Sequence, residues 1–119
     1  MYNEARSFLS RTVSKTRWAA KNKRDLEFAI DTEDVMLILK KQNYKCALTG
    51  WELEFTRGGD FDGKNPKGAT IDRIDNSKGY SKDNVQITCV LANLIKRHLS
   101  NDKFIELCNA VTTQQKNLG

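Results

Sequence analysis

Two short segments of the sequence carry the side chains best suited to chemistry. Asp72 stands near the end of a β-branched run that begins at Thr70, and Asn84 precedes a second such run. Asn93 follows in a stretch that is expected to be helical. An order of strand, loop, strand and helix brings Asp72 and Asn93 together, and their oxygen atoms suit Mg²⁺ or Mn²⁺ better than zinc. In a basic protein, such a cation site indicates phosphodiester chemistry.

The elements expected to hold these residues are a short antiparallel hairpin and a helix. We predict strands near 69–73 and 85–88, joined by a loop that contains Gly79. Lys96 follows Asn93 on nearly the same helix face, where it either reaches a phosphate near the metal or stays in solvent. The helix is expected to run from about Val90 to His98, with its apolar residues inward: Leu91, Leu94 and Ile95.

A basic helix is predicted at the N-terminal side, over residues 4–23. Its apolar edge contains Leu9, Val13 and Ala20. Such a helix can dock on the rest of the protein while it presents positive charge to phosphates. Trp18 falls on neither face, and we expect it to pack in the core or in an interface. The basic residues lie on a face next to the apolar edge: Arg6, Arg17, Lys21 and Arg24.

Three further segments are predicted between the basic helix and the hairpin. Asp31 and Thr32 offer an N-cap for a helix that ends near Gln42. Residues 44–55 are expected to form a strand, a turn and a returning strand. Residues 56–68 are rich in Gly, Asp, Lys and Asn, which predicts a surface loop.

The C-terminal segment is predicted to form an amphipathic helix. Ser100 or Asn101 is expected to cap it, and residues 112–119 are expected to fray. The length of 119 residues is that of one compact domain. Within it, residues 1–30 are expected to form a basic helical arm and residues 31–119 the main body.

The charge distribution favours nucleic acid as a partner. The net charge is +5, and residues 1–24 hold seven basic side chains against one acid, Glu4. A basic segment beside a nearly neutral body is typical of nucleic-acid binding, although a solvated helix face has the same composition. Three cysteines give no disulfide framework and no apolar run reaches the length of a membrane span, so we expect a cytoplasmic protein that contacts no membrane.

The segment from about Tyr44 to Lys96 resembles the HNH, or ββα-metal, endonucleases. Asn84 and Asn93 match the loop Asn and the helical metal ligand of family members that use Asn at the ligand position. Motifs of this type are found in many small phage and prophage nucleases, which implies action inside a bacterial host cell. Three motifs carry the resemblance: Cys-Ala-Leu-Thr-Gly at 46–50, Ile-Asp-Arg-Ile-Asp at 71–75 and Gly-Tyr at 79–80.

The resemblance implies both a fold and an activity. The implied fold is α+β, with a ββα-metal motif in which a short antiparallel hairpin is flanked by helices. The implied activity is metal-dependent hydrolysis of phosphodiester bonds in double-stranded DNA, by a monomer or a homodimer that nicks one strand or cuts both. Asp72 and Asn93 would hold Mg²⁺ or Mn²⁺. The implied catalytic set is Asp72, Arg73, Asn84 and Asn93, and the implied nucleic-acid contacts are Arg6, Arg17, Lys21, Arg24 and Lys96.

Two departures from the family pattern change the expected chemistry. Zinc-binding members carry two Cys-x-x-Cys pairs, whereas here each pair keeps one thiol, Cys46 or Cys89. Two thiols cannot complete a four-ligand zinc site, so we expect no structural zinc and two neighbouring buried cysteines. Arg73 stands where Asp-His members have their general base. A guanidinium cannot accept a proton, but it can bind the scissile phosphate and stabilise the transition state.

The identity of the general base is therefore open at the level of sequence. The candidates are a metal-activated water, His98, and Asp75 acting through a water. On a continuous helix His98 would point away from Asn93, and Asp75 shares a strand face with Arg73, where an ion pair is expected. Two other functions compete with the nuclease. One is a DNA-binding protein on an HNH scaffold without catalysis, and the other is a small protein-interaction domain whose basic helix binds an acidic partner.

Overall fold

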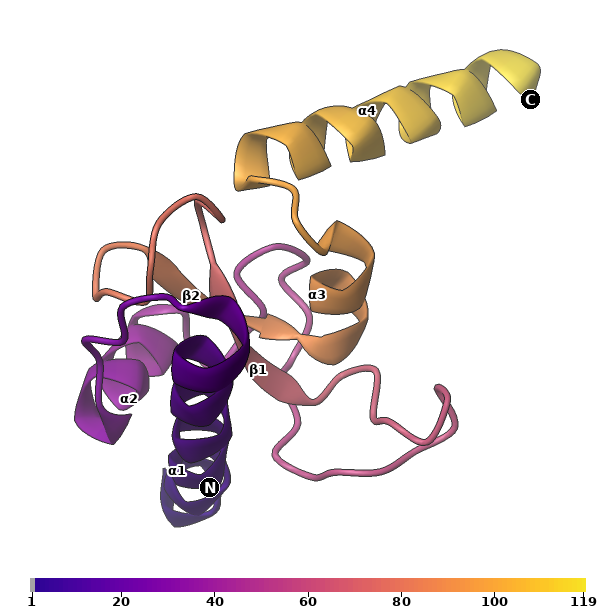
Figure 1. The fold of residues 1–119 in the computed structure, drawn as a ribbon. Helices are drawn as coiled ribbons and strands as arrows, with labels where there is room; N and C mark the ends of the chain where they lie inside the picture. The colour runs from indigo at the N-terminus through magenta and orange to yellow at the C-terminus, as the bar shows by residue number, and fades with distance from the viewer. Residues whose placement is uncertain (1) are drawn as a thin grey trace.

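The computed structural model describes residues 2–119, which form four α-helices and one two-stranded sheet (Figure 1). The first helix continues into a wider, π-helical turn, η1. The elements in chain order are α1 (Tyr2–Ala19), η1 (Ala20–Arg24), α2 (Thr32–Lys41), β1 (Ala69–Arg73), β2 (Val85–Cys89), α3 (Val90–Lys96) and α4 (Asn101–Leu118). The α+β class predicted from the sequence is confirmed.

The two strands pair in antiparallel fashion and place Asp72 directly opposite Gln86. Strand β2 is buried along its whole length, and Ile87 and Cys89 have no exposed surface. Both predicted strands are confirmed within one residue. Because cross-strand partners point to the same face of a sheet, this register determines which side chain meets the Asp72 carboxylate.

Helix α1 packs against α2 and against strand β1 and supplies a large part of the hydrophobic core. The predicted apolar edge is confirmed for Leu9, Val13 and Ala20, and Phe8 joins it. Burial of such side chains contributes about 1.5–3 kcal/mol each, so the basic segment is anchored by its own apolar residues. Of the two environments expected for Trp18, the core is excluded, because 57% of its surface is exposed; the Lys23 ammonium lies 5.5 Å from the centre of its ring.

Helix α2 begins at the predicted N-cap. The Asp31 carboxylate accepts a hydrogen bond from the Asp34 backbone N–H, and the Asp34 carboxylate accepts one from the Asp31 backbone N–H. This reciprocal pair satisfies two N–H groups that the first helical turn leaves free. The helix ends at Lys41, and its apolar face buries Val35, Met36 and Leu39.

Residues 44–55 reverse direction as expected, but the two arms form only a minimal hairpin. A single bridge joins Lys45 and Glu52, and the chain between them turns tightly, with the Gly50 N–H donating to the Cys46 carbonyl. Asn43 and Tyr44 both have positive φ angles, of 55° and 62°. This left-handed backbone keeps Tyr44 out of an extended strand, so the first arm starts no earlier than Lys45. The surface loop predicted at 56–68 is confirmed, apart from two isolated bridges, one between Phe61 and Lys64 and one between Gly68 and Glu54.

Helix α3 is shorter than predicted, and it buries a different face. It ends at Lys96 because Arg97 has a φ angle of 48°, which no right-handed helix can continue through. Leu91 packs against the core as expected, but Leu94 and Ile95, also expected to face inward, are exposed, while Ala92 and Lys96 are buried. The buried partner of Lys96 is a carboxylate on β1, so an ion pair rather than an apolar stripe decides the orientation of this helix.

Helix α4 projects away from the body of the molecule (Figure 1). Its N-cap is Ser100, whose hydroxyl accepts a hydrogen bond from the Lys103 backbone N–H. The fraying expected at 112–119 does not occur, since the helix continues to Leu118. Within the described chain, Phe104 is the buried side chain of this helix. None of the helices in residues 2–119 combines the length and the apolar character that crossing a membrane requires.

Asn84 holds the loop between the two strands, as expected. Its amide nitrogen donates to the carbonyls of Asp75 and Gly79 at 3.0 and 2.8 Å, and its amide oxygen accepts from the Asp75 N–H at 3.0 Å. The side chain is almost completely buried. The Asn84 side chain therefore supplies hydrogen bonds to the backbone at the point where the two strands separate and no longer pair with each other. These bonds position the end of β1.

We predict that Asn84→Ala lowers the free energy of unfolding by about 1–3 kcal/mol, because it leaves buried backbone groups of the loop without partners. Chemical denaturation followed by circular dichroism measures the change. Asn76→Ala in the same loop is the control: the Asn76 side chain makes no hydrogen bond within residues 2–119, so its loss should cost less than about 0.5 kcal/mol. Equal stability of the two variants would show that Asn84 does not hold the loop.

Candidate functional site

A cavity of about 220 Å³ lies where β1, the following loop, η1 and the end of α3 meet. Asp72 and Asn93, the two predicted cation ligands, both line it. That the two side chains share one ion stays a prediction. The other polar side chains at this cavity are Arg24, Arg73, Asn76, Tyr80, Arg97 and His98.

Asp72 is held by a buried ion pair that the sequence did not reveal. The Lys96 ammonium lies 2.6 Å from Asp72 Oδ2 and 2.7 Å from the Arg73 carbonyl oxygen. The Lys96 side chain has no exposed surface, and that of Asp72 is 6% exposed. Lys96 was predicted to reach a phosphate or to stay in solvent, but the structure places it in neither position. Its charge neutralises the Asp72 carboxylate instead.

The ion pair belongs to a hydrogen-bonded network that joins four elements. Gln86, the cross-strand partner of Asp72, donates to the same Oδ2 atom at 2.8 Å. Gln86 also exchanges two hydrogen bonds with the side chain of Asn101 at the start of α4. The network therefore links β1, β2, α3 and α4, and it fixes the carboxylate of Asp72 in one orientation.

The donor set at this cavity fits a hard divalent cation held by few protein ligands. Asp72 Oδ1 accepts no hydrogen bond from residues 2–119 and is left for another partner. Asn93, which carries an amide oxygen, lines the same cavity. Within the described chain, no three His, Cys, Asp or Glu side chains gather in a way that would hold a metal ion. Mg²⁺ commonly needs only one or two carboxylates, because waters and phosphates complete its coordination.

The Arg73 guanidinium is anchored to the loop that follows β1. Its Nη1 donates to the carbonyls of Asn76 and Lys78 at 2.6 and 3.0 Å, and its Cζ lies 5.3 Å from the centre of the Tyr80 ring. Arg73 also lines the cavity. Its remaining N–H groups have no acceptor within residues 2–119, so the side chain is fixed on one edge and open on the other.

His98 lines the cavity, although the geometry of a continuous helix predicted that it would point elsewhere. On a continuous helix it would point away from Asn93, but α3 ends at Lys96 and the chain reverses at Arg97. As a result, His98 lines the same cavity as Asp72 and Asn93. It is the only histidine of the chain. No pattern in the sequence predicted the left-handed conformation of Arg97, which brings His98 to the cavity.

The Asp75 side chain is hydrogen-bonded within the loop that follows β1. We expected it to form an ion pair with Arg73, and that pair does not form. Its Oδ1 accepts hydrogen bonds from the Ser77 hydroxyl at 2.7 Å and the Ser77 N–H at 2.9 Å. These bonds lower the pKa of Asp75 below its ordinary value, because they stabilise the charged carboxylate. A carboxylate with a lowered pKa is a weaker base, which makes Asp75 less suited to activate a water.

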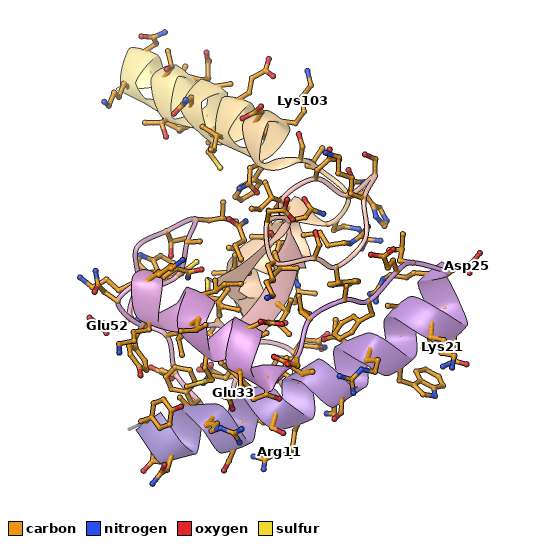
Figure 2. The ribbon with its side chains drawn as sticks, turned by 90° about the vertical axis from the view of Figure 1, so that its left-hand side faces the viewer. Arg11, Lys21, Asp25, Glu33, Glu52 and Lys103 are labelled. Carbon is orange, nitrogen blue, oxygen red and sulfur yellow. The ribbon has the colours of Figure 1, made fainter. Side chains whose placement is uncertain are left out.

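The basic residues predicted to contact nucleic acid have different environments. Arg24, at the end of η1, lines the cavity. Arg17 and Lys21 are exposed, and Figure 2 shows Lys21 projecting from the helix. Arg6 is engaged elsewhere: it forms an ion pair with Glu33 on α2, and the hydrogen bond to that carboxylate raises the pKa of Arg6. The cavity also has Arg97, which the sequence did not single out.

The two cysteines of the incomplete knuckles are buried neighbours, as expected. The Cys89 backbone N–H donates to Cys46 Sγ at 3.3 Å, and the Thr49 N–H donates to the same atom at 3.5 Å. Burial opposes ionisation of Cys46, but hydrogen bonds from Thr49 and from the Cys89 N–H outweigh it and lower its pKa. Burial raises the pKa of Cys89. The contact joins the 46–50 turn to the end of β2.

We predict that Lys96→Met lowers the free energy of unfolding by about 3–5 kcal/mol, because it leaves the Asp72 carboxylate buried without its countercharge. The double variant Asp72→Asn/Lys96→Met should recover most of that loss. Equilibrium denaturation in urea measures both. The matched control is Lys103→Met, whose exposed pair with Glu106 at 3.5 Å should contribute less than about 1 kcal/mol. If Lys96→Met is as stable as this control, the pair does not hold α3 on the sheet.

Comparison with known protein families found no match, and comparison with curated proteins found none. Among solved structures, one similar chain is described as the rare-cutting HNH restriction endonuclease PacI, with a mechanism of DNA perturbation. The TM-score is 0.61, the alignment covers 92% of this chain and 80% of that chain, and 20% of the residues are identical. At this identity the similarity shows the fold alone. This small α+β protein has the fold of an HNH endonuclease.

Proposed function

We propose that the protein is a divalent-metal-dependent endonuclease of the HNH type that hydrolyses phosphodiester bonds in DNA. The observation that carries the proposal is the single cavity lined by Asp72, Asn93 and His98 together with three arginines. The fold it shares with an HNH restriction endonuclease supports the same activity. Double-stranded DNA is the proposed substrate, and either a nick or a double-strand cut fits the site.

The charges around the cavity favour the binding of a phosphate. Arg24, Arg73 and Arg97 line it, and the carboxylate of Asp72 is already neutralised by Lys96. The open edge of Arg73 suits bidentate binding of phosphate oxygens. In this role Arg73 would stabilise the negative charge of the transition state, and Arg24 and Arg97 would attract the nucleic-acid backbone.

Asp72 Oδ1 and the amide oxygen of Asn93 are the groups that would hold Mg²⁺ or Mn²⁺. Such an ion would stabilise the charge that develops on the scissile phosphate and on the leaving oxygen. The positive surroundings oppose binding of a cation to the free protein. We therefore expect weak metal binding by the protein alone and stronger binding once a phosphate has entered the cavity.

His98 is the proposed general base. A neutral imidazole accepts a proton from water near neutral pH, which the guanidinium of Arg73 cannot do. Asp75 is disfavoured because the Ser77 hydrogen bonds lower its pKa. His98 is exposed and lines the cavity beside both proposed metal ligands, so a water between it and a bound phosphate can lose its proton to the imidazole.

We predict that the protein nicks supercoiled plasmid with Mg²⁺ or Mn²⁺ and that EDTA stops the reaction. Asp72→Asn and Asn93→Ala should abolish nicking. Asp72→Asn is preferred to Asp72→Ala because an Asn oxygen can still accept from Lys96 and Gln86. It leaves the Lys96 ammonium without its countercharge, so circular dichroism verifies that this variant is folded, and Asn93→Ala tests the site without changing the ion pair. Absence of nicking by wild-type protein with any divalent metal would refute the proposal.

We predict that His98→Ala lowers the rate of nicking by about 100-fold or more, while DNA binding changes by less than a few fold. Single-turnover cleavage and fluorescence anisotropy measure the two quantities separately. Asp102→Asn, a neighbouring exposed substitution that lies outside the cavity, is the control and should cleave at the wild-type rate. An equal loss of cleavage and binding in His98→Ala would make His98 a binding residue.

The runner-up is a DNA-binding protein on the same scaffold without catalysis. The neutralisation of Asp72 by Lys96 favours it, because a carboxylate with a bonded ammonium holds a cation less strongly. Binding of duplex DNA that weakens steeply with salt, without nicking in any divalent metal, would identify this function.

A further inference from the structure

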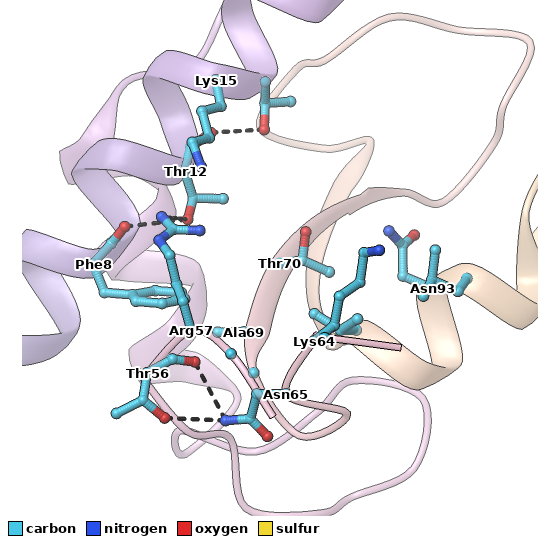
Figure 3. Close-up of a pocket in the computed structure, with 16 residues that line it drawn as sticks. Phe8, Thr12, Lys15, Thr56, Arg57, Lys64, Asn65, Ala69, Thr70 and Asn93 are labelled. Carbon is cyan, nitrogen blue, oxygen red and sulfur yellow. Dashed lines mark hydrogen bonds between the residues drawn. The ribbon is translucent and has the colours of Figure 1, made fainter. Parts of the chain in front are cut away.

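A second and larger cavity, of about 410 Å³, adjoins the candidate active site (Figure 3). The two cavities share Asn93 and Leu94, so α3 forms part of the wall of each. The remaining walls are formed by α1, by the loop at 56–68 and by the start of β1. A volume in this range is typical of sites that enclose a small organic ligand.

The lining of this larger cavity combines apolar surface with unpaired positive charge. Phe8, Val90 and Leu94 supply apolar wall, and the basic residues are Lys15, Arg57 and Lys64. No acidic residue of the described chain lines the cavity, and none of these three basic side chains forms an ion pair within residues 2–119. Such a lining suits a ligand with a flat apolar part and a negatively charged part.

Arg57 is arranged to present a flat face. Its guanidinium lies 4.5 Å from the centre of the Phe8 ring, and its Nη2 donates to the Thr12 hydroxyl at 3.4 Å. Figure 3 shows it between the loop and α1. A guanidinium fixed over an aromatic ring offers its other face to a nucleobase, since bases stack on arginine planes.

We propose that this cavity binds one unpaired nucleotide of the nucleic-acid substrate, next to the phosphate that occupies the active-site cavity. Arg57 and the apolar wall take the base, and Lys15 and Lys64 take its phosphate. Asn93 and Leu94 line both cavities, so the proposed nucleotide site adjoins the active-site cavity. The assignment rests on the proposed nuclease function and specifies the form of its substrate. A stacked base pair exposes only its edges, so a base must leave the stack to enter.

The proposal predicts that affinity for short single-stranded DNA depends on one base. Anisotropy of a labelled eight-nucleotide strand, measured in EDTA to prevent cleavage, is compared with strands that carry an abasic residue at each position in turn. Loss of the stacked base should weaken binding about fivefold to 100-fold at one position and little at the others. Equal affinity for all strands would overturn the proposal.

Two variants, each with a matched control, locate the sensitive site. Thr16→Trp fills the cavity from α1 and should abolish the dependence on that base, whereas Ser14→Trp, on the same helix but outside the cavity, should keep it. Lys64→Ala should weaken binding several-fold more than Lys40→Ala, an exposed lysine on α2. If Thr16→Trp binds and keeps the one-base dependence, the base is held elsewhere and the assignment fails.

Because these measurements contain no metal, they are independent of cleavage. A protein that shows the one-base dependence yet nicks no plasmid would refute the nuclease and leave the nucleotide site. A protein that nicks plasmid but binds every abasic strand equally would refute the nucleotide site and leave the nuclease.

Discussion

The buried ion pair between Lys96 and Asp72 is the interaction on which the arrangement of the site depends. Moving both charges out of water costs several kcal/mol per ion, which is offset only by close contact and further hydrogen bonds. Both are present: the ammonium lies 2.6 Å from the carboxylate, and Gln86 and the Arg73 carbonyl complete the network. The pair fixes α3 against the sheet, and Asn93 and His98 are positioned by that helix and by the turn after it.

The same pair determines the electrostatic character of the cavity. With Asp72 neutralised, the charges that remain are those of the arginines, so an anion is attracted before a cation. This order fits a nuclease in which substrate phosphate completes the metal site. It also keeps one carboxylate oxygen, Oδ1, free for a ligand while the other is bound within the protein.

The sequence predicted the backbone elements that form the site, but it did not predict the positions of all the side chains within it. The two strands and the Asn84 hydrogen bonds followed from short-range patterns and motif order, and the structure has both. Asp72 and Asn93 line one cavity, and their sharing of a metal ion stays a prediction. Lys96 and His98 were placed wrongly. Each depends on a property that pattern does not encode: the burial of a charge that finds a distant partner, and a left-handed residue, Arg97, that ends the helix early. Leu94 and Ile95 were predicted to face inward because the apolar periodicity of the helix was given more weight than Lys96, but both are exposed.

The most direct measurement is paramagnetic broadening of backbone NMR signals by Mn²⁺. The protein is titrated in the presence of a short oligonucleotide whose phosphodiester bonds resist cleavage. If the cavity is the metal site, the signals of Asp72, Asn93 and His98 broaden first, and they do so at lower Mn²⁺ with the oligonucleotide than without it. Two results would contradict a shared cation and phosphate site in this cavity. One is broadening that begins elsewhere, for example at the exposed carboxylates of the 56–68 loop, and the other is broadening that needs the same Mn²⁺ concentration with and without the oligonucleotide.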